Sequence, residues 1–388
     1  MNMKRMLRTL LPTSVKKLIK VFPKYIFYWI PIQKNKIIFI NFAGAPFGDN
    51  PKYICLEMVR QKLQVDQVWL LHNLRSFLPD GVRGVSLNSL RSFYELATAH
   101  VIIVNINNIL PGRFKKKAGQ IIIQTWHGSH GFKYIERQAE DTLTPDYISA
   151  SKLSTDMTDI FISDGPENTQ MYRAAFQCTC KIIETGMPRE DILFTANQQQ
   201  LDTIKDSLGI AKDKLILLYA PTFRDNERTD VYNLDFDSIL SALTQRFGHE
   251  WIILLRLHPN VKGCEINCDS NKIINVSSYG DPQELIAISD ALITDYSSIY
   301  HDFFITEKPV FVYTPDLTDY ITQNRHLKPS FFTMPWVCNK DMHTLIENIL
   351  HFDNEKYKKM VSDYRDSIGA IADGKASYRV VEYIKRFL

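Results

Sequence analysis

The sequence predicts an α/β protein made of two doubly wound units, each organised around a parallel sheet. Short runs of apolar, mostly β-branched residues recur along the chain, and helix-like stretches separate most of them. Within a run the apolar residues are continuous, which is typical of strands that are covered on both faces. A polar stretch without such a run, residues 188–214, divides the runs into two sets of similar size.

The expected strands are the apolar runs themselves. Before the polar stretch they are Lys36–Phe42, Gln67–His72, His100–Asn105, Gln120–Thr125, Asp159–Ser163 and Lys181–Glu184. After it they are Lys214–Ala220, Trp251–Leu257, Lys272–Val276, Ala291–Thr294 and Pro309–Tyr313. We therefore place a domain boundary near residue 195, with an N-terminal unit at 35–195 and a C-terminal unit at 196–388.

Two Rossmann-like units that face one another across a cleft make up the GT-B architecture, which is the fold we expect. A dehydrogenase with a Rossmann fold is the main rival. It is disfavoured because the glycines of residues 41–49, after the first strand, lack the GxGxxG spacing of dinucleotide-binding proteins.

The composition is that of an ordinary soluble globular protein. Of 388 residues, 45% are hydrophobic and 23% are charged, which excludes a disordered chain, a collagen-like fibre and a disulfide-stapled miniprotein. The formal net charge of +3 argues against a uniformly basic nucleic-acid binder. None of the six cysteines has the spacing of a zinc knuckle, so we expect mostly reduced, buried thiols in a cytoplasmic protein.

Residues 1–34 form a basic leader. Nine lysines and arginines precede the first acidic residue, Asp49, and aliphatic and aromatic residues lie between them. Prolines and lysines interrupt the leader, so it lacks both the ~20 apolar residues of a membrane span and the unbroken core of a signal peptide. The alternation of cationic and aromatic residues favours a peripheral amphipathic helix on an anionic membrane over a solvated surface helix.

Two segments with candidate site residues follow strands of different units. His127 lies between a strand end and a glycine, where an imidazole faces the cleft and can accept a proton near neutral pH. The segment Ala220–Arg224 carries Thr222 and Arg224, and a planar guanidinium suits a phosphate or carboxylate. A structural hydrogen bond for His127 and a surface salt bridge for Arg224 are the alternatives.

Two further segments belong to the C-terminal unit. Arg256 and His258 close a strand, so that each predicted sheet ends in a histidine at the same cleft. Another strand leads through Asp295, Ser297 and Ser298 into an amphipathic helix. Hydroxyls at a helix start either cap its free N–H groups or, together with those groups, bind an anion such as a diphosphate. Helix capping accounts for one serine at this position but less well for two, so the second serine favours anion binding.

Four motifs, WHG, APTFR, RLHP and TDYSSIYHDF, occur in this order and resemble those of the CDP-glycerol glycerophosphotransferase family. This family builds the backbones of teichoic acids and related capsular poly(alditol phosphates). Pro309–Tyr320 resembles the family's next segment, and the likeness covers roughly residues 35–320. The resemblance implies a GT-B enzyme in the cytoplasm that attaches peripherally to the inner face of the cell membrane, which suits the basic leader.

The resemblance also implies an activity. Glycerol phosphate passes from CDP-glycerol to a hydroxyl of a lipid-linked glycan or polyol-phosphate acceptor, and CMP is released. Matched by motif, His127 resembles the general base that deprotonates the acceptor, and a second group resembles the ligands of the donor diphosphate: His258, Ser297 and Ser298. The same cleft would be lined by Thr222, Arg224, Arg256 and Asp295. We expect no cofactor and no nucleic-acid partner. We also expect no metal site, because no DxD motif follows a strand end.

Two departures from the family pattern leave the substrates open. Residues 129–133 read Ser-His-Gly-Phe-Lys where the family commonly has Thr-Pro-Leu-Lys, and residues 321–329 replace its arginine–glycine–aromatic stretch. The alternatives are a CDP-ribitol ribitolphosphotransferase, another GT-B enzyme that uses a sugar nucleotide, and a non-catalytic module that binds an anionic polymer.

Overall fold

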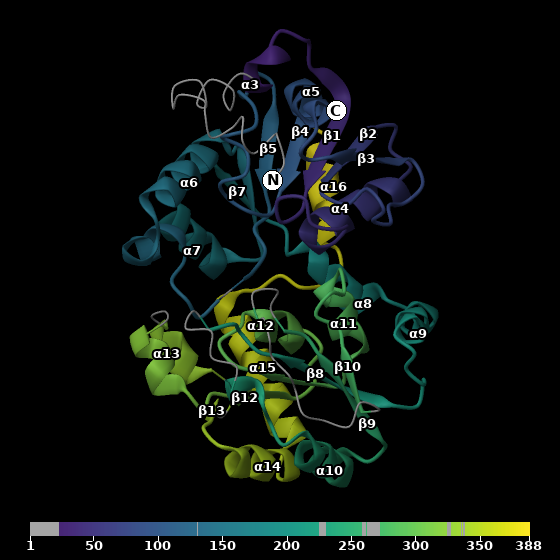
Figure 1. Cartoon of the computed structure of the whole chain (residues 1–388), viewed down its shortest axis with the longest axis vertical. Helices are drawn as coiled ribbons and strands as arrows, with labels where there is room; N and C mark the ends of the chain where they lie inside the picture. The colour runs from purple at the N-terminus through teal and green to yellow at the C-terminus, as the bar shows by residue number, and fades with distance from the viewer. Residues whose placement is uncertain are drawn as a thin grey trace, which may run out of the picture.

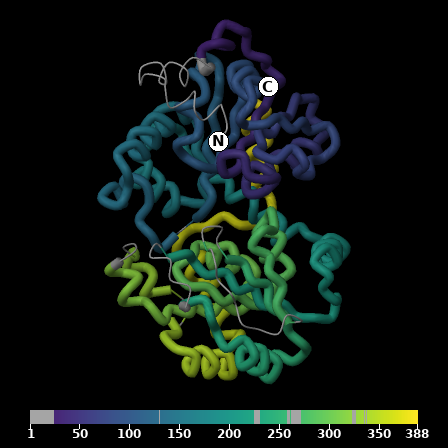
Figure 2. The backbone as a smooth tube through the Cα atoms, in the orientation of Figure 1, coloured from purple at the N-terminus to yellow at the C-terminus, as the bar shows by residue number. Residues whose placement is uncertain are grey.

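The structure, a computed structural model, describes residues 23–129, 131–224, 230–257, 261, 272–323, 327–334, 336 and 338–388. These residues form two α/β units, one above the other along the long axis of the molecule (Figure 1). The tube in Figure 2 shows that the chain passes from the upper unit to the lower one and returns to the upper one near its end. The predicted α/β class with two parallel sheets is confirmed. Most of the basic leader, residues 1–22, lies outside the described residues.

The upper unit is built on a seven-stranded parallel sheet with the order β3-β2-β1-β4-β5-β6-β7. Its strands are β1 (Gln33–Ile40), β2 (Asp66–Leu71), β3 (Val82–Ser86), β4 (Ala99–Val104), β5 (Ile121–Gln124), β6 (Ile160–Ser163) and β7 (Lys181–Glu184). The helices around it are α3 (Pro23–Ile26), α4 (Asp49–Arg60), α5 (Leu90–Thr98), η1 (Glu136–Thr142), α6 (Pro145–Met157) and α7 (Pro166–Phe176). The second half of β1, residues 37–40, is continuously apolar because Ile37 and Phe39 pack into the core on one face of the sheet, and Ile38 and Ile40 into the core on the other.

The lower unit is built on a six-stranded parallel sheet with the order β10-β9-β8-β11-β12-β13. Its strands are β8 (Leu215–Ala220), β9 (Trp251–Leu255), β10 (Ile273–Asn275), β11 (Ala291–Thr294), β12 (Val310–Tyr313) and β13 (Cys338–Asn339). The helices from β7 onward are η2 (Pro188–Asp191), α8 (Ile192–Thr195), α9 (Gln198–Ser207), η3 (Asp230–Tyr232), α10 (Phe236–Phe247), α11 (Pro282–Ile288), α12 (Ile299–Phe304), α13 (Leu317–Gln323), η4 (Pro329–Thr333), α14 (Met342–Leu350) and α15 (Asn354–Ile368). The boundary predicted near residue 195 falls between the two sheets.

The last helix, α16 (Ala376–Ile384), leaves the lower unit and packs on the upper one beside α4 (Figure 1). Its residues Val380, Val381 and Ile384 are fully buried in the core formed with β1 and α4. The expected C-terminal unit at 196–388 therefore differs from the structure in this element. The apolar face of α16 is covered by the first sheet rather than the second.

The segment that returns to the upper unit is held closely against the loops after β6 and β7. The backbone N–H of Ile371 donates to the carbonyl oxygen of Asp164 at 2.6 Å. The carboxylate of Asp191 accepts from the N–H groups of the first two residues of α16 at 2.9 and 2.7 Å. Gly186 has a φ of +81°, and a Cβ there would lie 2.6 Å from the carbonyl oxygen of Ile371. Only glycine fits at position 186, where the two backbone segments approach each other this closely.

The structure differs from the sequence analysis at one pair of cysteines. Cys178 and Cys180 form a disulfide, with their Cα atoms 5.3 Å apart. The expectation of reduced thiols is therefore wrong for this pair, because the turn between them brings the two side chains within bonding reach. Cys55 and Cys338 are free thiols.

Candidate functional site

Two cavities are lined by residues of both units. The smaller has a volume of about 300 Å³ and the larger about 560 Å³. His127 of the upper unit and Ser297 and Ser298 of the lower unit line both cavities. The structure therefore brings together three residues that the sequence singled out in different units. Groups bound in the two cavities would meet at this shared lining.

His127 is held so that one ring nitrogen is committed to the backbone. Its Nδ1 lies 2.7 Å from the carbonyl oxygen of Asn105, which can only accept, so Nδ1 carries the proton and Nε2 the lone pair. Phe42 and Trp126 flank the imidazole, with ring centroids 5.0 and 4.1 Å away. Burial lowers the pKa of His127 below its usual value, against the opposing effects of the Asn105 carbonyl and Asp49. The ring is therefore neutral near pH 7, as a general base requires.

Ser297 and Ser298 lie at the start of α12, directly after β11. The Oγ of Ser297 accepts a hydrogen bond from the N–H of Ile299 at 3.4 Å. Ser298 occupies the N-cap position, but its side chain makes no capping hydrogen bond. Gly128 allows the histidine loop to approach closely, because a Cβ at this position would lie 3.3 Å from the Oγ of Ser298. The two hydroxyls thus adjoin the histidine loop, and only one of them serves the helix.

Thr222, Asp295 and Arg224 form a fixed group beside these serines. Thr222 lines the smaller cavity, and its Oγ1 donates to Oδ1 of Asp295 at 2.5 Å. The guanidinium of Arg224 pairs with Asp295 at 2.9 Å and with Asp316 at 2.7 Å. Burial lowers the pKa of Arg224, but the two carboxylates more than offset this and raise it. Neither Arg224 nor Asp295 lines the two cavities. Both instead hold Thr222 in position, because Asp295 accepts from its hydroxyl and Arg224 donates to its carbonyl oxygen.

Arg256 lines the larger cavity. Its Nη1 donates to the carbonyl oxygens of Val276 and Tyr279 at 3.2 and 2.9 Å. Burial lowers the pKa of this guanidinium, with Asp281 opposing the effect, yet an arginine stays charged in proteins. A half-buried cation at the cavity favours an anionic ligand. His258, predicted in the same segment, lies outside the described residues, so its role stays a prediction.

The segment after His127 crosses to the lower unit, which the sequence did not predict. The ring of Phe132 stacks on Tyr300, with centroids 4.1 Å apart, and the carbonyl oxygen of Phe132 accepts from the N–H of Lys328 at 2.7 Å. Lys133 and Lys328 line the smaller cavity. Gly131, Phe132 and Lys133 therefore build part of this cavity, and Lys133 and Lys328 bring cations to it.

Sequence reasoning also missed Arg189, which joins the histidine loop to the lower unit. Its Nη1 donates to the carbonyl oxygen of His127 at 2.6 Å, and its Nη2 pairs with Oδ1 of Asp302 at 2.9 Å. Asp49 lies 3.3 Å from the same guanidinium. Burial would lower the pKa of Arg189, but Asp302 and Asp49 raise it. The sequence did offer one sign of this role, since Arg189 follows closely after a predicted strand. It lies, however, in the polar stretch that we interpreted as the boundary between the units.

A group of three potential metal ligands exists among the described residues, outside the lining of the two cavities. Asp164, Glu190 and His301 form this group, and none of them lines either cavity. The cavities offer hydroxyls, an imidazole and cations, which suit the binding of phosphate groups. The larger cavity also has the carboxylates of Asp49 and Asp302, both paired with Arg189.

Comparisons with known proteins agree on one family. Residues 24–386 match the family described as CDP-Glycerol:Poly(glycerophosphate) glycerophosphotransferase. The chain is 32% identical over 367 residues to the teichoic acid poly(glycerol phosphate) polymerase of Bacillus spizizenii, a match that covers 91% of this chain and 92% of that protein. It is 30% identical over 375 residues to the protein of the same name from Staphylococcus epidermidis, covering 92% of this chain but 51% of the relative. The chain thus spans about half the length of the staphylococcal protein.

A solved structure shares the whole architecture. The structure of the wall teichoic acid polymerase TagF aligns with a TM-score of 0.83 at 27% sequence identity, and the alignment covers 100% of this chain and 98% of that one. The arrangement of the two parallel sheets is therefore that of a known GT-B-like architecture.

Proposed function

This chain belongs to the CDP-glycerol:poly(glycerophosphate) glycerophosphotransferase family, and we propose that it transfers glycerol phosphate from CDP-glycerol to a hydroxyl group, with release of CMP. The observation that carries the proposal is the meeting of His127 with Ser297 and Ser298 at the lining shared by the two cavities. A general base beside hydroxyls that bind a diphosphate is what such a transfer requires.

The larger cavity is the proposed donor site. Arg256 presents a cation there, and the hydroxyls of Ser297 and Ser298 offer hydrogen bonds to the oxygens of a diphosphate. His258, two residues beyond Arg256 in the sequence, is expected to add a further contact. These groups hold the CDP moiety and stabilise the negative charge that develops on the departing CMP.

The smaller cavity is the proposed acceptor site. Lys133 and Lys328 line it and suit the phosphates of a polyol-phosphate or lipid-linked acceptor. The acceptor hydroxyl gives its proton to Nε2 of His127 as its oxygen attacks the β-phosphorus of CDP-glycerol. The bond between this phosphorus and the bridging oxygen breaks, and CMP leaves with the electron pair. Side chains of the enzyme balance the charge, and we expect the reaction to need no cofactor.

The N-terminal end is the proposed membrane contact, at the inner face of the cell membrane. Tyr25 and Trp29 are 43% and 86% exposed. Lys115 lies beside them, with its Nζ 4.8 Å from the centre of the Tyr28 ring. Exposed aromatic rings among lysines are typical of segments that lie in a membrane interface. Among the described residues, no helix combines the length and the apolar character needed to cross a bilayer.

The activity is tested by following CMP release from CDP-glycerol with a lipid-linked polyol-phosphate acceptor. We expect turnover with this donor and turnover lowered by ~10²–10⁴-fold in the His127→Ala chain. Faster turnover of CDP-ribitol than of CDP-glycerol would instead identify a ribitolphosphotransferase. Turnover with sugar nucleotides only would identify a glycosyltransferase. Binding of the acceptor polymer without turnover of any donor would contradict an enzymatic function.

A further inference from the structure

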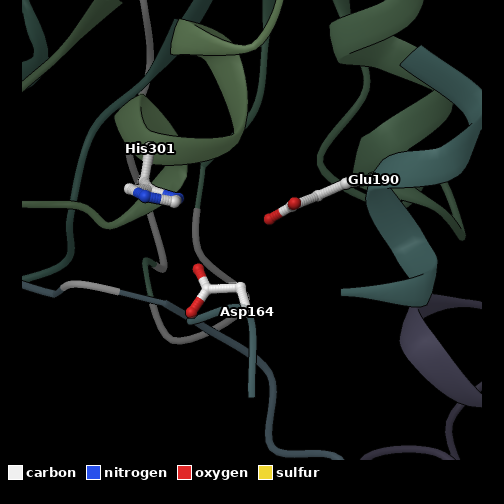
Figure 3. Close-up of side chains that lie close together, drawn as sticks. All are labelled: Asp164, Glu190 and His301. Carbon is white, nitrogen blue, oxygen red and sulfur yellow. The ribbon is translucent and has the colours of Figure 1, made fainter. Parts of the chain in front are cut away.

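Three buried ionisable side chains converge where the two units meet (Figure 3). Asp164 follows β6 of the upper unit, Glu190 lies in η2 between the units, and His301 lies in α12 of the lower unit. Their exposed fractions are 1%, 2% and 3%. One potential ligand atom from each residue lies within 4.8 Å of the other two. We call these three residues the junction cluster.

The charges around the junction cluster are unbalanced among the described residues. Asp164 and Glu190 add two carboxylates to those of Asp49 and Asp302. The guanidinium among them is that of Arg189, which pairs with Asp49 at 3.3 Å and with Asp302 at 2.9 Å. Even with a proton on the imidazole of His301, two cations would face these four buried carboxylates, and a low-dielectric surrounding disfavours the remaining negative charge strongly.

Glu190 provides the second observation. Its Oε1 is buried without a hydrogen-bond partner in the described part of the chain, and its carboxylate points into the cluster (Figure 3). Burial, together with the like charges of Asp302 and Asp164, raises the pKa of Glu190 well above its usual value. Either a proton or a cation must therefore offset this carboxylate.

We propose that Asp164, Glu190 and His301 bind a divalent transition-metal ion, and that their donor set selects Zn²⁺. Carboxylate oxygens and an imidazole nitrogen are ordinary Zn²⁺ ligands at bond lengths of ~2.0–2.2 Å. Mg²⁺ and Ca²⁺ prefer oxygen ligands throughout and are therefore disfavoured. The ion takes the place of a proton on Glu190 and supplies the missing positive charge.

An ion in the junction cluster holds the two units together. Ligand atoms of a tetrahedral Zn²⁺ lie about 3.4 Å apart at a bond length of ~2.1 Å. The three atoms here lie within 4.8 Å of one another, so binding brings the more widely spaced of them closer together. Because the ligands come from both units and from the segment between them, this contraction draws the units toward each other. Glu190 adjoins Arg189, whose guanidinium holds the loop of His127. The ion therefore acts as a positioning element away from the substrates.

The test uses the full chain after its metals have been removed with a chelator. Titration with Co²⁺, which occupies Zn²⁺ sites, should produce visible d–d bands that saturate at one equivalent, without the near-ultraviolet band of a thiolate ligand. The Glu190→Gln and His301→Phe variants should bind Zn²⁺ at least about tenfold more weakly. The matched control is the exposed pair Glu347 and His351 at the C-terminal end of α14, where Nδ1 of His351 lies 3.4 Å from Oε2 of Glu347. Replacing them in the same way should leave binding unchanged.

Thermal unfolding gives an independent readout. Zn²⁺ should raise the unfolding midpoint of the wild-type chain and of the control variant, but not that of the junction variants. If a junction variant does not fold, as circular dichroism would show, the Co²⁺ spectrum of the wild-type chain decides alone. Absence of those bands, or equal Zn²⁺ binding by junction and control variants, overturns the proposal and leaves a proton on Glu190 as the compensating charge.

Discussion

The Nη2 atom of Arg189 lies 2.9 Å from Oδ1 of Asp302, and this buried ion pair joins the segment after the first sheet to helix α12 of the second unit. The other terminal nitrogen of the same guanidinium donates to the carbonyl oxygen of His127. The position of the proposed base therefore depends on an interaction between the units. A change at Arg189 should affect both stability and turnover.

We expect Arg189→Met to lower the free energy of unfolding by ~3–5 kcal/mol, because it leaves the buried carboxylates of Asp49 and Asp302 without their cation. Urea denaturation measures this loss. The matched control is Arg60→Met, which removes an exposed ion pair with Glu57 and should scarcely change stability. Similar losses in the two variants would show that the Arg189 pair contributes no more than a surface contact.

His127→Ala should lower turnover by ~10²–10⁴-fold, the usual contribution of a general base. The affinity for CDP-glycerol should scarcely change, because the imidazole is assigned to the acceptor proton. Single-turnover CMP release and calorimetry measure the two quantities separately. His343→Ala, at an exposed position of α14, is the control. Loss of donor binding in the His127 variant would reverse the assignment of acceptor and donor sides.

The dependence of turnover on pH should have an acid limb below pH 6.5. Burial lowers the pKa of His127 from its usual 6.5, so the ring stays neutral and basic until the pH falls below that value. Protonation at lower pH removes the lone pair of Nε2, and turnover falls with it. CMP release measured between pH ~5 and ~8 at saturating donor tests this. A limb centred above pH 6.5 would contradict the buried, neutral imidazole.

The double change Ser297→Ala and Ser298→Ala should weaken CDP-glycerol binding by ~1.5–3 kcal/mol for each charge-assisted hydrogen bond lost. His258→Ala should act in the same direction. Turnover should also slow, because the same contacts stabilise the leaving CMP. Calorimetry with CDP-glycerol measures the effect, and the exposed serines Ser238 and Ser367, changed to alanine together, serve as the control. Unaltered donor affinity would remove these hydroxyls from the donor site.

Deletion of residues 1–32 should abolish binding to anionic vesicles and leave chemistry on a soluble acceptor nearly intact. The deletion ends just before β1, so it spares the first sheet. Binding of the full chain should weaken as salt rises, because the screening length falls from ~10 Å at 0.1 M to ~3 Å at 1 M. Binding is measured by flotation with anionic and with neutral vesicles. The difference between the two gives the electrostatic contribution to binding, and binding to neutral vesicles gives the apolar contribution. A truncated chain that floats as well as the full one would contradict the proposed membrane contact.

The sequence predicted every strand of the two sheets except two edge strands. Each apolar run corresponds to a strand, and central strands such as the one that begins in Lys36–Phe42 are apolar because both of their faces are covered. The two missed strands are β3 and β13, which lie at the edges of their sheets. Strand β3 contains Arg83 and Gly84 and is half exposed, while β13 spans two residues. Neither has enough apolar residues to stand out in a local window.

The candidate site was predictable only where its residues follow strands. His127, Ser297 and Ser298 were found because strand ends in this architecture face the cleft. Arg189 was missed because its role rests on Asp302, 113 positions away, and no local pattern encodes such a pair. The place of α16 was missed for a related reason. Its apolar residues show that one face is buried but not which sheet covers that face.

The return of α16 to the upper unit also has a consequence for synthesis of the protein. The strands of the first sheet leave the ribosome early, but the helix that completes one of their two cores is made after the whole second sheet. Part of the apolar face of the nascent upper unit therefore stays uncovered while the lower unit is translated. A partly finished chain with such a face is prone to aggregate or to engage a chaperone. The upper unit thus completes its folding only with the last helix, and the two units mature together.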